Sequence, residues 1–304
     1  MTTTTMTQKT KKTVAQGWIS GFIGVAIFAG SLPATRVAVM DFDPVFLTAV
    51  RATIAALLGG TVLLICKQRI PAKTDFPALT VVALGVVVGF PLLSAEALQY
   101  VTSAHAIVFL GILPLFTAIF SVLRGDKSPP MLFWLFALLG SSFVAGYAAL
   151  SNEHSSLLGG LLMLGAVLAC AIGYAEGARL ARTLGSWQVI SWALVLSLPM
   201  MLIVTYVSMP TSLLLISNSA WAGLLYVSFF SMFIGFIFWY RGLALGGIAA
   251  VGQLQLLQPF MGLALAALLL HEAIDTGMVI STLGAVICVI GAKKFATQPK
   301  VSAS

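Results

Sequence analysis

Two acidic residues lie inside long apolar stretches, where a charged side chain costs about 2.5 to 3.5 kcal/mol on membrane-insertion scales. They are Glu96 and Glu176. Charged groups in such places usually face an ionic partner or a water-filled cavity. The basic residues within reach are Arg36 and Arg51 for Glu96, and Arg179 and Arg241 for Glu176. We therefore expect two ion-pair networks near opposite membrane faces, which either gate a pathway or simply join helices.

Amide, hydroxyl and aromatic side chains in the apolar stretches are the candidates for binding a small polar molecule. Gln255 and Gln258 share one helix face, and their amides can donate to and accept from a zwitterion or instead hydrogen-bond neighbouring helices. Phe236 is a further candidate for an aromatic wall. The predicted substrate-binding residues are Ser31, Glu96, Gln99, Tyr100, His105, Tyr174, Trp239, Gln255 and Gln258.

Prolines inside apolar stretches remove a helix hydrogen bond and bend the chain. Pro114 and Pro259 follow similar segments, so each is expected to bend a helix beside a central cavity, or is a tolerated kink. The predicted gating residues are Arg36, Arg51, Glu96, Glu176, Arg179, Arg241, Pro114 and Pro259.

Catalytic signatures are missing from the sequence. It contains no metalloprotease HExxH motif, no Gly-x-Ser-x-Gly motif, no paired aspartates within one apolar stretch and no Gly-rich phosphate loop, and these motifs carry the common chemistries. The three cysteines, Cys66, Cys170 and Cys288, lack metal-ligand spacing. We therefore expect no enzyme activity, no metal and no cofactor.

The elements that must position these residues are membrane helices. Of the 304 residues, 60% are hydrophobic and 8% are charged, against about 25% charged residues in a soluble domain. Apolar stretches of about 20 residues are long enough to cross a bilayer as helix. Residues 161–172 do not alternate apolar and polar side chains as a barrel strand would. The predicted class is an all-α membrane protein with ten transmembrane helices, at 18–39, 45–66, 77–98, 103–123, 131–150, 157–178, 187–208, 220–240, 248–270 and 277–292.

Basic residues alternate along the connections between these helices. Lys and Arg occur in the N-terminal head, in every second connection and in the C-terminal tail, and the other connections have none. By the positive-inside rule both termini are cytoplasmic, in the cell's inner membrane. The net charge of +7 then reflects topology and not a nucleic-acid partner. The expected partners are the lipid bilayer and a small-molecule substrate, and a monomer is expected to suffice.

The chain repeats itself weakly. An offset of 145 residues places Leu98 on Leu243 and Pro114 on Pro259. We predict a first five-helix repeat at 17–151 and a second at 152–295, between cytoplasmic tails at 1–16 and 296–304. Five helices are an odd number, so the second repeat must be inverted, as in many secondary transporters. The alternative is a duplication that only enlarged a helix bundle.

Several short segments carry a family resemblance. Residues 30–38 (GSLPATRVA), Asp43-Pro44 and 49–52 (AVRA) resemble the opening of EamA-type members of the drug/metabolite transporter superfamily. Residues 97–100 before Pro114, and 242–244 before Pro259 and His271-Glu272, look like the later segments of that family. The resemblance covers nearly the whole chain and implies an exporter of amino acids, aromatic or other neutral ones, or of related metabolites.

The predicted function is thus a secondary transporter that exports small organic metabolites by alternating access. The alternatives are a proton-coupled drug or metabolite efflux carrier and a passive channel, and a membrane-embedded enzyme comes third. The small four-helix proton-coupled exporters hold a carboxylate deep in their first helix, whereas residues 18–39 contain none. No Lys lies in a predicted helix, so neutral or zwitterionic cargo fits better than phosphorylated sugars.

Overall fold

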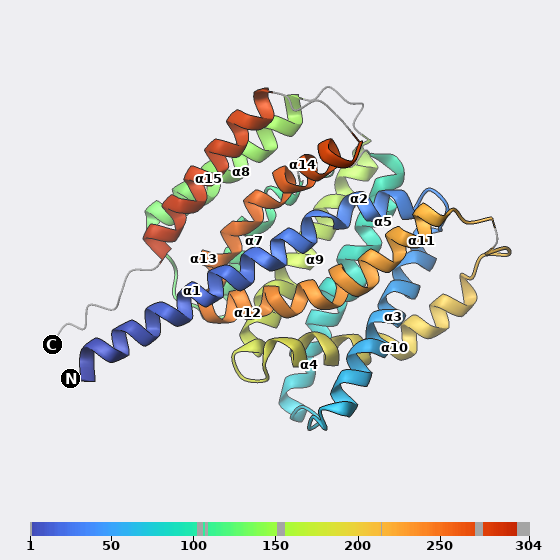
Figure 1. Ribbon diagram of the computed structural model, residues 1–304, viewed down its shortest axis with the longest axis horizontal. Helices are drawn as coiled ribbons and strands as arrows, with labels where there is room; N and C mark the ends of the chain where they lie inside the picture. The colour runs from blue at the N-terminus through green and yellow to red at the C-terminus, as the bar shows by residue number, and fades with distance from the viewer. Residues whose placement is uncertain are drawn as a thin grey trace.

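The computed structural model describes residues 2–101, 106, 109–150, 156–213, 215–270 and 276–296, and helix is the regular structure throughout these ranges (Figure 1). Seven helical stretches in the described part are long and apolar enough to cross a membrane, and two shorter apolar helices, Leu113–Leu123 and Met131–Phe143, accompany them. The predicted all-helical membrane class is confirmed.

The first half of the chain runs from α1 to α8. Its elements are α1 (Thr2–Ala29), α2 (Ser31–Ala38), α3 (Pro44–Ile65), η1 (Lys73–Asp75), α4 (Phe76–Val82), η2 (Ala83–Gly89), α5 (Phe90–Tyr100), α7 (Leu113–Leu123) and α8 (Met131–Leu150). The second half comprises α9 (Leu157–Ala181), α10 (Ser186–Val207), α11 (Asn218–Leu225), η3 (Tyr226–Gly235), α12 (Phe236–Gly246), α13 (Ile248–Gly252), η4 (Gln253–Leu257), α14 (Gln258–Leu270) and α15 (Thr276–Ala296).

Local sequence sets where several helices begin. Asp43 caps α3, because its carboxylate accepts hydrogen bonds from the backbone nitrogens of Val45 at 2.9 Å and Phe46 at 3.1 Å. Pro44 occupies the first turn, where a missing N–H costs nothing. Ser156 caps α9 in the same way, through the backbone nitrogen of Gly159. Between α12 and α13, Gly247 has a φ of 93°, which glycine adopts without a steric penalty.

Irregular helix occurs at matching places in the two halves. The π-helix η2, Ala83–Gly89, shifted by 145 residues becomes 228–234, which lies inside the π-helix η3, Tyr226–Gly235. Likewise α7 begins at Leu113-Pro114 and α14 begins at Gln258-Pro259. Single stretches of π-helix often mark functional positions. The weak sequence repeat is therefore matched by repeated local structure.

Helices of one half pack against helices of the other. The pairs α3 with α10 and α8 with α15 lie side by side at opposite edges of the bundle, and α1 packs on α12 (Figure 1). Small residues let α1 and α12 approach closely. A Cβ on Gly17 would lie 2.5 Å from the backbone nitrogen of Gly246, and a Cβ on Gly242 would lie 2.6 Å from the Cα of Gly21.

This close contact predicts that Gly242→Val destabilises the fold by about 1 to 3 kcal/mol, because the added side chain meets the backbone of α1 and the helices must separate. The measurement is thermal unfolding of the purified protein in detergent. The control is Gly146→Val in α8, where a Cβ meets nothing within 4 Å. Equal melting temperatures for the two variants would contradict the packing described here.

Candidate functional site

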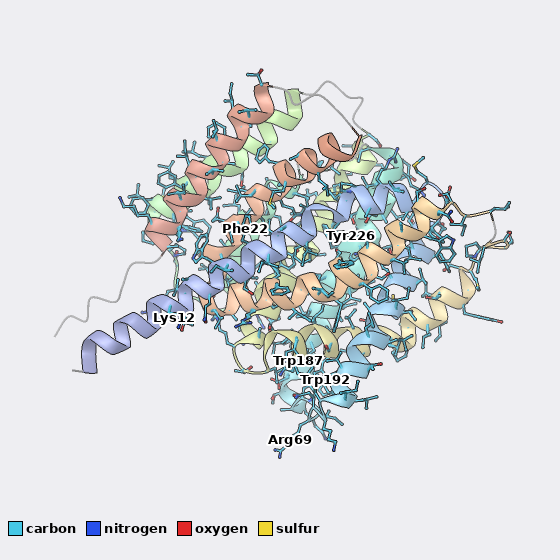
Figure 2. The ribbon with its side chains drawn as sticks, in the orientation of Figure 1. Lys12, Phe22, Arg69, Trp187, Trp192 and Tyr226 are labelled. Carbon is cyan, nitrogen blue, oxygen red and sulfur yellow. The ribbon has the colours of Figure 1, made fainter. Side chains whose placement is uncertain are left out.

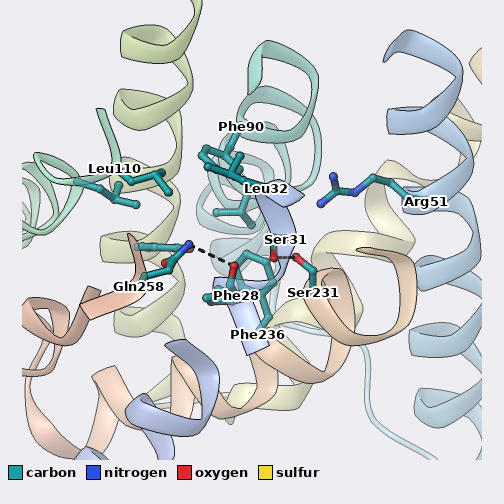
Figure 3. Close-up of a pocket in the computed structure, with 12 residues that line it drawn as sticks. Phe28, Ser31, Leu32, Arg51, Phe90, Leu110, Ser231, Phe236 and Gln258 are labelled. Atoms are coloured by element: carbon teal, nitrogen blue, oxygen red, sulfur yellow. Dashed lines mark hydrogen bonds between the residues drawn. The ribbon is translucent and has the colours of Figure 1, made fainter. Parts of the chain in front are cut away.

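A small, partly open cavity lies between the two halves of the chain (Figure 3). Its lining comes from both halves: Phe28, Ser31, Leu32, Arg51, Val86, Phe90, Leu110, Leu113, Tyr174, Ser231, Phe236 and Gln258. The space open to water is about 20 Å³, which is room for about one water molecule. The helices around the cavity must therefore separate before anything larger can enter.

Equivalent positions of the two repeats face this cavity. At the offset of 145 residues, Val86 in η2 corresponds to Ser231 in η3, and Leu113 corresponds to Gln258. In both of these pairs the first repeat contributes an apolar side chain and the second a polar one. Of the two glutamines predicted on the ninth span, the structure brings Gln258 to the cavity.

Two hydrogen bonds hold the lining together. The Ser31 hydroxyl donates to the Ser231 hydroxyl at 2.8 Å and so joins α2 to the π-helix η3. The Gln258 amide donates to the carbonyl of Phe28 at 3.3 Å and joins α14 to the end of α1. Both bonds cross between the repeats, so they connect the surfaces that must part if the cavity opens.

Aromatic rings form one wall of the cavity. Phe28 stacks on Tyr174 with ring centroids 6.4 Å apart. It packs edge-on with Phe236, where the ring centroids are 5.1 Å apart. Trp239 lies behind them, fully buried, with its ring centroid 5.4 Å from that of Tyr174. Offset and edge-on ring pairs of this kind add stability beyond the area that they bury. Of the predicted aromatic residues, Tyr174 and Phe236 line the cavity directly and Trp239 supports them.

Arg51 is the charged residue of the lining. It lies on α3, and its side chain points into the cavity (Figure 3), with only 4% of its surface exposed. Its Nε has no hydrogen-bond partner. No described residue accepts a hydrogen bond from the guanidinium or forms an ion pair with it. The predicted pairing of Arg51 with Glu96 is wrong, because the guanidinium faces the cavity.

Arg36 also differs from its prediction. Its guanidinium donates to the backbone carbonyl of Leu98 and does not pair with Glu96. Leu98 lies in the last turn of α5, where carbonyls lack a partner within the helix. Arg36 thus supplies a hydrogen-bond donor to a backbone carbonyl at the end of the neighbouring helix α5. Glu96 is half-buried and takes part in none of the ion pairs among the described residues.

At the other membrane face, Glu176 forms the predicted type of network. Its carboxylate accepts from Arg124 at 2.6 and 2.9 Å and from Arg179 at 2.5 Å. The Glu176 side chain is 2% exposed, whereas the two arginines are 53% and 45% exposed. The pairing with Arg179 is confirmed, but the second partner is Arg124, and Arg241 is exposed and outside the network. Arg124 directly follows α7, and the packing of α7 on α9 is what brings it to Glu176. The sequence alone therefore does not identify Arg124 as a partner.

A second ion pair ties the same two segments together. Arg182, just after α9, donates to the carboxylate of Asp126 at 2.8 and 3.0 Å. The carboxylate of this pair is 28% exposed, against 2% for that of Glu176. The ends of α7 and α9 are thus joined twice on this face.

The opposite face is closed by apolar and polar contacts between the segment after α2 and the start of α11. The Phe42 ring packs edge-on against Trp221, with centroids 5.2 Å apart. The Asp41 carboxylate accepts hydrogen bonds from the hydroxyl and the backbone nitrogen of Ser217. These hydrogen bonds, from the hydroxyl above all, lower the pKa of Asp41 below its ordinary value.

The remaining predicted residues lie away from the cavity or beside it. Gln99 and Tyr100 are exposed, Tyr100 by 47%. Gln255 is 1% exposed, and neither of its amide atoms has a hydrogen-bond partner in the described structure, but it does not line the cavity. Pro114 and Pro259 are buried next to lining residues. His105 lies outside the described residues.

Sequence reasoning missed Phe28 and Ser231. Phe28 lies in an ordinary apolar run and gave no signal of its own. Ser231 could have been found from the repeat, because it is the counterpart of Val86 and a hydroxyl among apolar neighbours.

Comparisons with known proteins agree with this architecture. The sequence profile of the EamA-like transporter family matches the chain twice, at residues 15–148 and 157–292. The "Uncharacterized transporter YdeK" of Bacillus subtilis is 60% identical over 280 residues, which are 92% of this chain and 98% of the relative. The "Uncharacterized transporter YyaM" of the same organism is 22% identical over 279 residues, or 88% and 90% of the two chains.

One solved crystal structure superposes with a TM-score of 0.74 at 19% identity, over 93% of this chain and 98% of that one, and so shares the fold. The two family matches and the closely similar transporter agree with the repeated helices. The chain therefore belongs to the EamA-like transporter family, within the drug/metabolite transporter superfamily.

Proposed function

We propose that this protein exports small organic metabolites across the cell's inner membrane by alternating access, and that neutral amino acids, aromatic ones first, are the class to test. The observation that carries the proposal is the buried cavity lined at equivalent positions of the two repeats. Inverted repeats that share one site can exchange conformations and so present that site to each membrane face in turn.

The contacts on either side of the cavity support two gates. On one face, Glu176 holds Arg124 and Arg179. On the other, Phe42 packs on Trp221, and Ser217 hydrogen-bonds Asp41. The Glu176–Arg124 pair joins α9 to the end of α7, and the contacts at the other face join residues 41–42 to residues 217–221, so each set can break while its own helices stay intact.

The distribution of basic residues supports an orientation. The start of α1 and the end of α15 lie at the same end of the bundle (Figure 1), and Lys12 and Arg69 lie toward this end (Figure 2). Lys and Arg remain on the cytoplasmic side of membrane proteins. We place both termini and the Glu176 gate at the cytoplasmic face.

Reconstituted protein tests the transport mechanism. We expect uptake of labelled phenylalanine into proteoliposomes to saturate and to accelerate when the vesicles are preloaded with unlabelled phenylalanine, because a carrier returns faster when loaded. Flux that rises linearly with concentration and ignores preloading would indicate a channel and contradict alternating access.

Filling the cavity should stop transport without unfolding the protein. Ser231→Met places an apolar side chain into a space that holds about one water. We expect the flux to fall at least about tenfold, a change of about 1.4 kcal/mol in the barrier. Ser142→Met, at an exposed position of α8, is the control and should keep the parental flux. Parental flux in a folded Ser231→Met protein would show that cargo takes another path.

Weakening the proposed inner gate should shift the protein toward its inward-facing state. In Glu176→Gln the neutral amide cannot balance two guanidinium charges, so the inward-closed state loses stability. We expect the half-saturating concentration of cargo at the outer face to rise several-fold in right-side-out vesicles, because fewer molecules face outward.

The matched control for the gate is Asp126→Asn, which removes the pair with Arg182, whose carboxylate is more exposed than that of Glu176. Exposed ion pairs contribute only about 0 to 1 kcal/mol, so this variant should transport as the parent does. Identical half-saturating concentrations for Glu176→Gln and the parent would remove the gate from the mechanism.

A further inference from the structure

We propose that the cargo of this transporter binds as an organic carboxylate, whose charged group pairs with Arg51 and whose apolar body packs against the aromatic wall. The inference rests on the proposed function, because it takes the central cavity as the transport site. It adds the chemical class of the cargo and assigns Arg51 to binding in place of gating.

The first reason is the unpaired charge. Arginine does not lose its proton in proteins, so the Arg51 side chain carries a full positive charge with 4% of its surface exposed. Buried charges in proteins are normally paired. Here no described residue bonds to the guanidinium, and its Nε has no partner. An anion in the cavity would supply the missing partner.

The second reason is that three described carboxylates are engaged elsewhere, and that Glu96, which takes part in no ion pair among the described residues, does not line the cavity. Glu176 binds two arginines, Asp126 binds Arg182 and Asp43 caps α3. None of them can turn to the cavity without giving up these bonds. Arg51 therefore stays available to a ligand.

The third reason is the arrangement of the lining. The guanidinium fork matches the two oxygens of a carboxylate, and the hydroxyls of Ser31 and Ser231 lie on the same side of the cavity as the guanidinium (Figure 3). The far side holds Leu110 and the Gln258 amide, which donates to the carbonyl of Phe28, and the aromatic ring of Phe236 lies below. One end of the cavity thus suits an oxyanion, and the remainder, apart from the Gln258 amide, suits a hydrocarbon or aromatic body.

The lining also indicates that the cargo does not need an ammonium group. Among the residues that line the cavity in the described structure there is no Asp or Glu to pair with an ammonium group. An amino acid would be held by its carboxylate alone. The corresponding acid without the amino group should therefore bind at least as tightly, because it avoids burying an unpaired ammonium.

Binding to the purified protein in detergent tests this directly, with probes that share one body and differ in charge. The probes are 3-phenylpropionate, its neutral amide, phenylalanine and phenethylamine. We expect 3-phenylpropionate to bind at least as tightly as phenylalanine, and at least about tenfold more tightly than the amide or the amine. Equal or tighter binding of the amide or the amine, or no binding of either carboxylate, overturns the inference.

Variants locate the effect at Arg51. Arg51→Met keeps an unbranched apolar stem and removes the charged guanidinium, so affinity for 3-phenylpropionate should fall at least about tenfold while affinity for the amide changes little. Arg51→Lys keeps a point charge without the fork and should retain the preference for the carboxylate at lower affinity. Arg69→Met, at an exposed loop position, is the control with parental binding.

Unchanged preference for the carboxylate in a folded Arg51→Met protein overturns the assignment. If that variant does not fold, the comparison of carboxylate with amide in the parental protein still decides the cargo class. The two proposals fail separately. Carboxylate binding that depends on Arg51, without preloading-stimulated flux, would contradict alternating access alone, whereas stimulated flux of the amine or the amide would contradict the carboxylate site alone.

Discussion

A hydrocarbon solvent cannot solvate charge, and this constraint decides where each ionised side chain of this membrane bundle lies. Glu176 is buried but holds two arginines that reach the surface. Arg36 is bonded to the end of α5 at Leu98. Arg51 has neither an ion-pair partner nor a helix-end carbonyl to bind among the described residues. Its guanidinium faces the central cavity instead. Glu176 and Arg36 join helices at the two faces of the bundle. Arg51 marks the site at which we infer that a ligand supplies the missing partner.

The inverted repeat explains why that place is central. Each helix pair that joins the halves, such as α1 with α12 or α3 with α10, takes one member from each repeat. The π-helices η2 and η3 then fall at equivalent positions and both contribute to the cavity lining. A cavity bounded by two related halves can open by movement of one half against the other, and the bonds of Ser31 to Ser231 and of Gln258 to Phe28 are those that must break.

Hydropathy predicted the membrane helices well, because the length and apolar character of a span are local properties of the chain. Side-chain partners were harder. Position along the sequence indicates how deep a residue lies in the bilayer but not which way it points around its helix. Glu96, Arg36 and Arg51 were therefore correctly grouped by position but wrongly paired, and Arg124 was missed because it approaches Glu176 only through packing of α7 on α9. Apolar lining residues such as Phe28 carry no sequence signal that separates them from the core.

The central claim is that one cavity is exposed to each membrane face in turn. The most direct measurement places a single cysteine at the cavity, as Ser31→Cys in a protein whose Cys66, Cys170 and Cys288 are replaced, and labels it with a membrane-impermeant thiol reagent from one face at a time. We predict labelling from both faces and protection by transported cargo. Labelling from one face only, in a variant that still transports, would contradict the central claim.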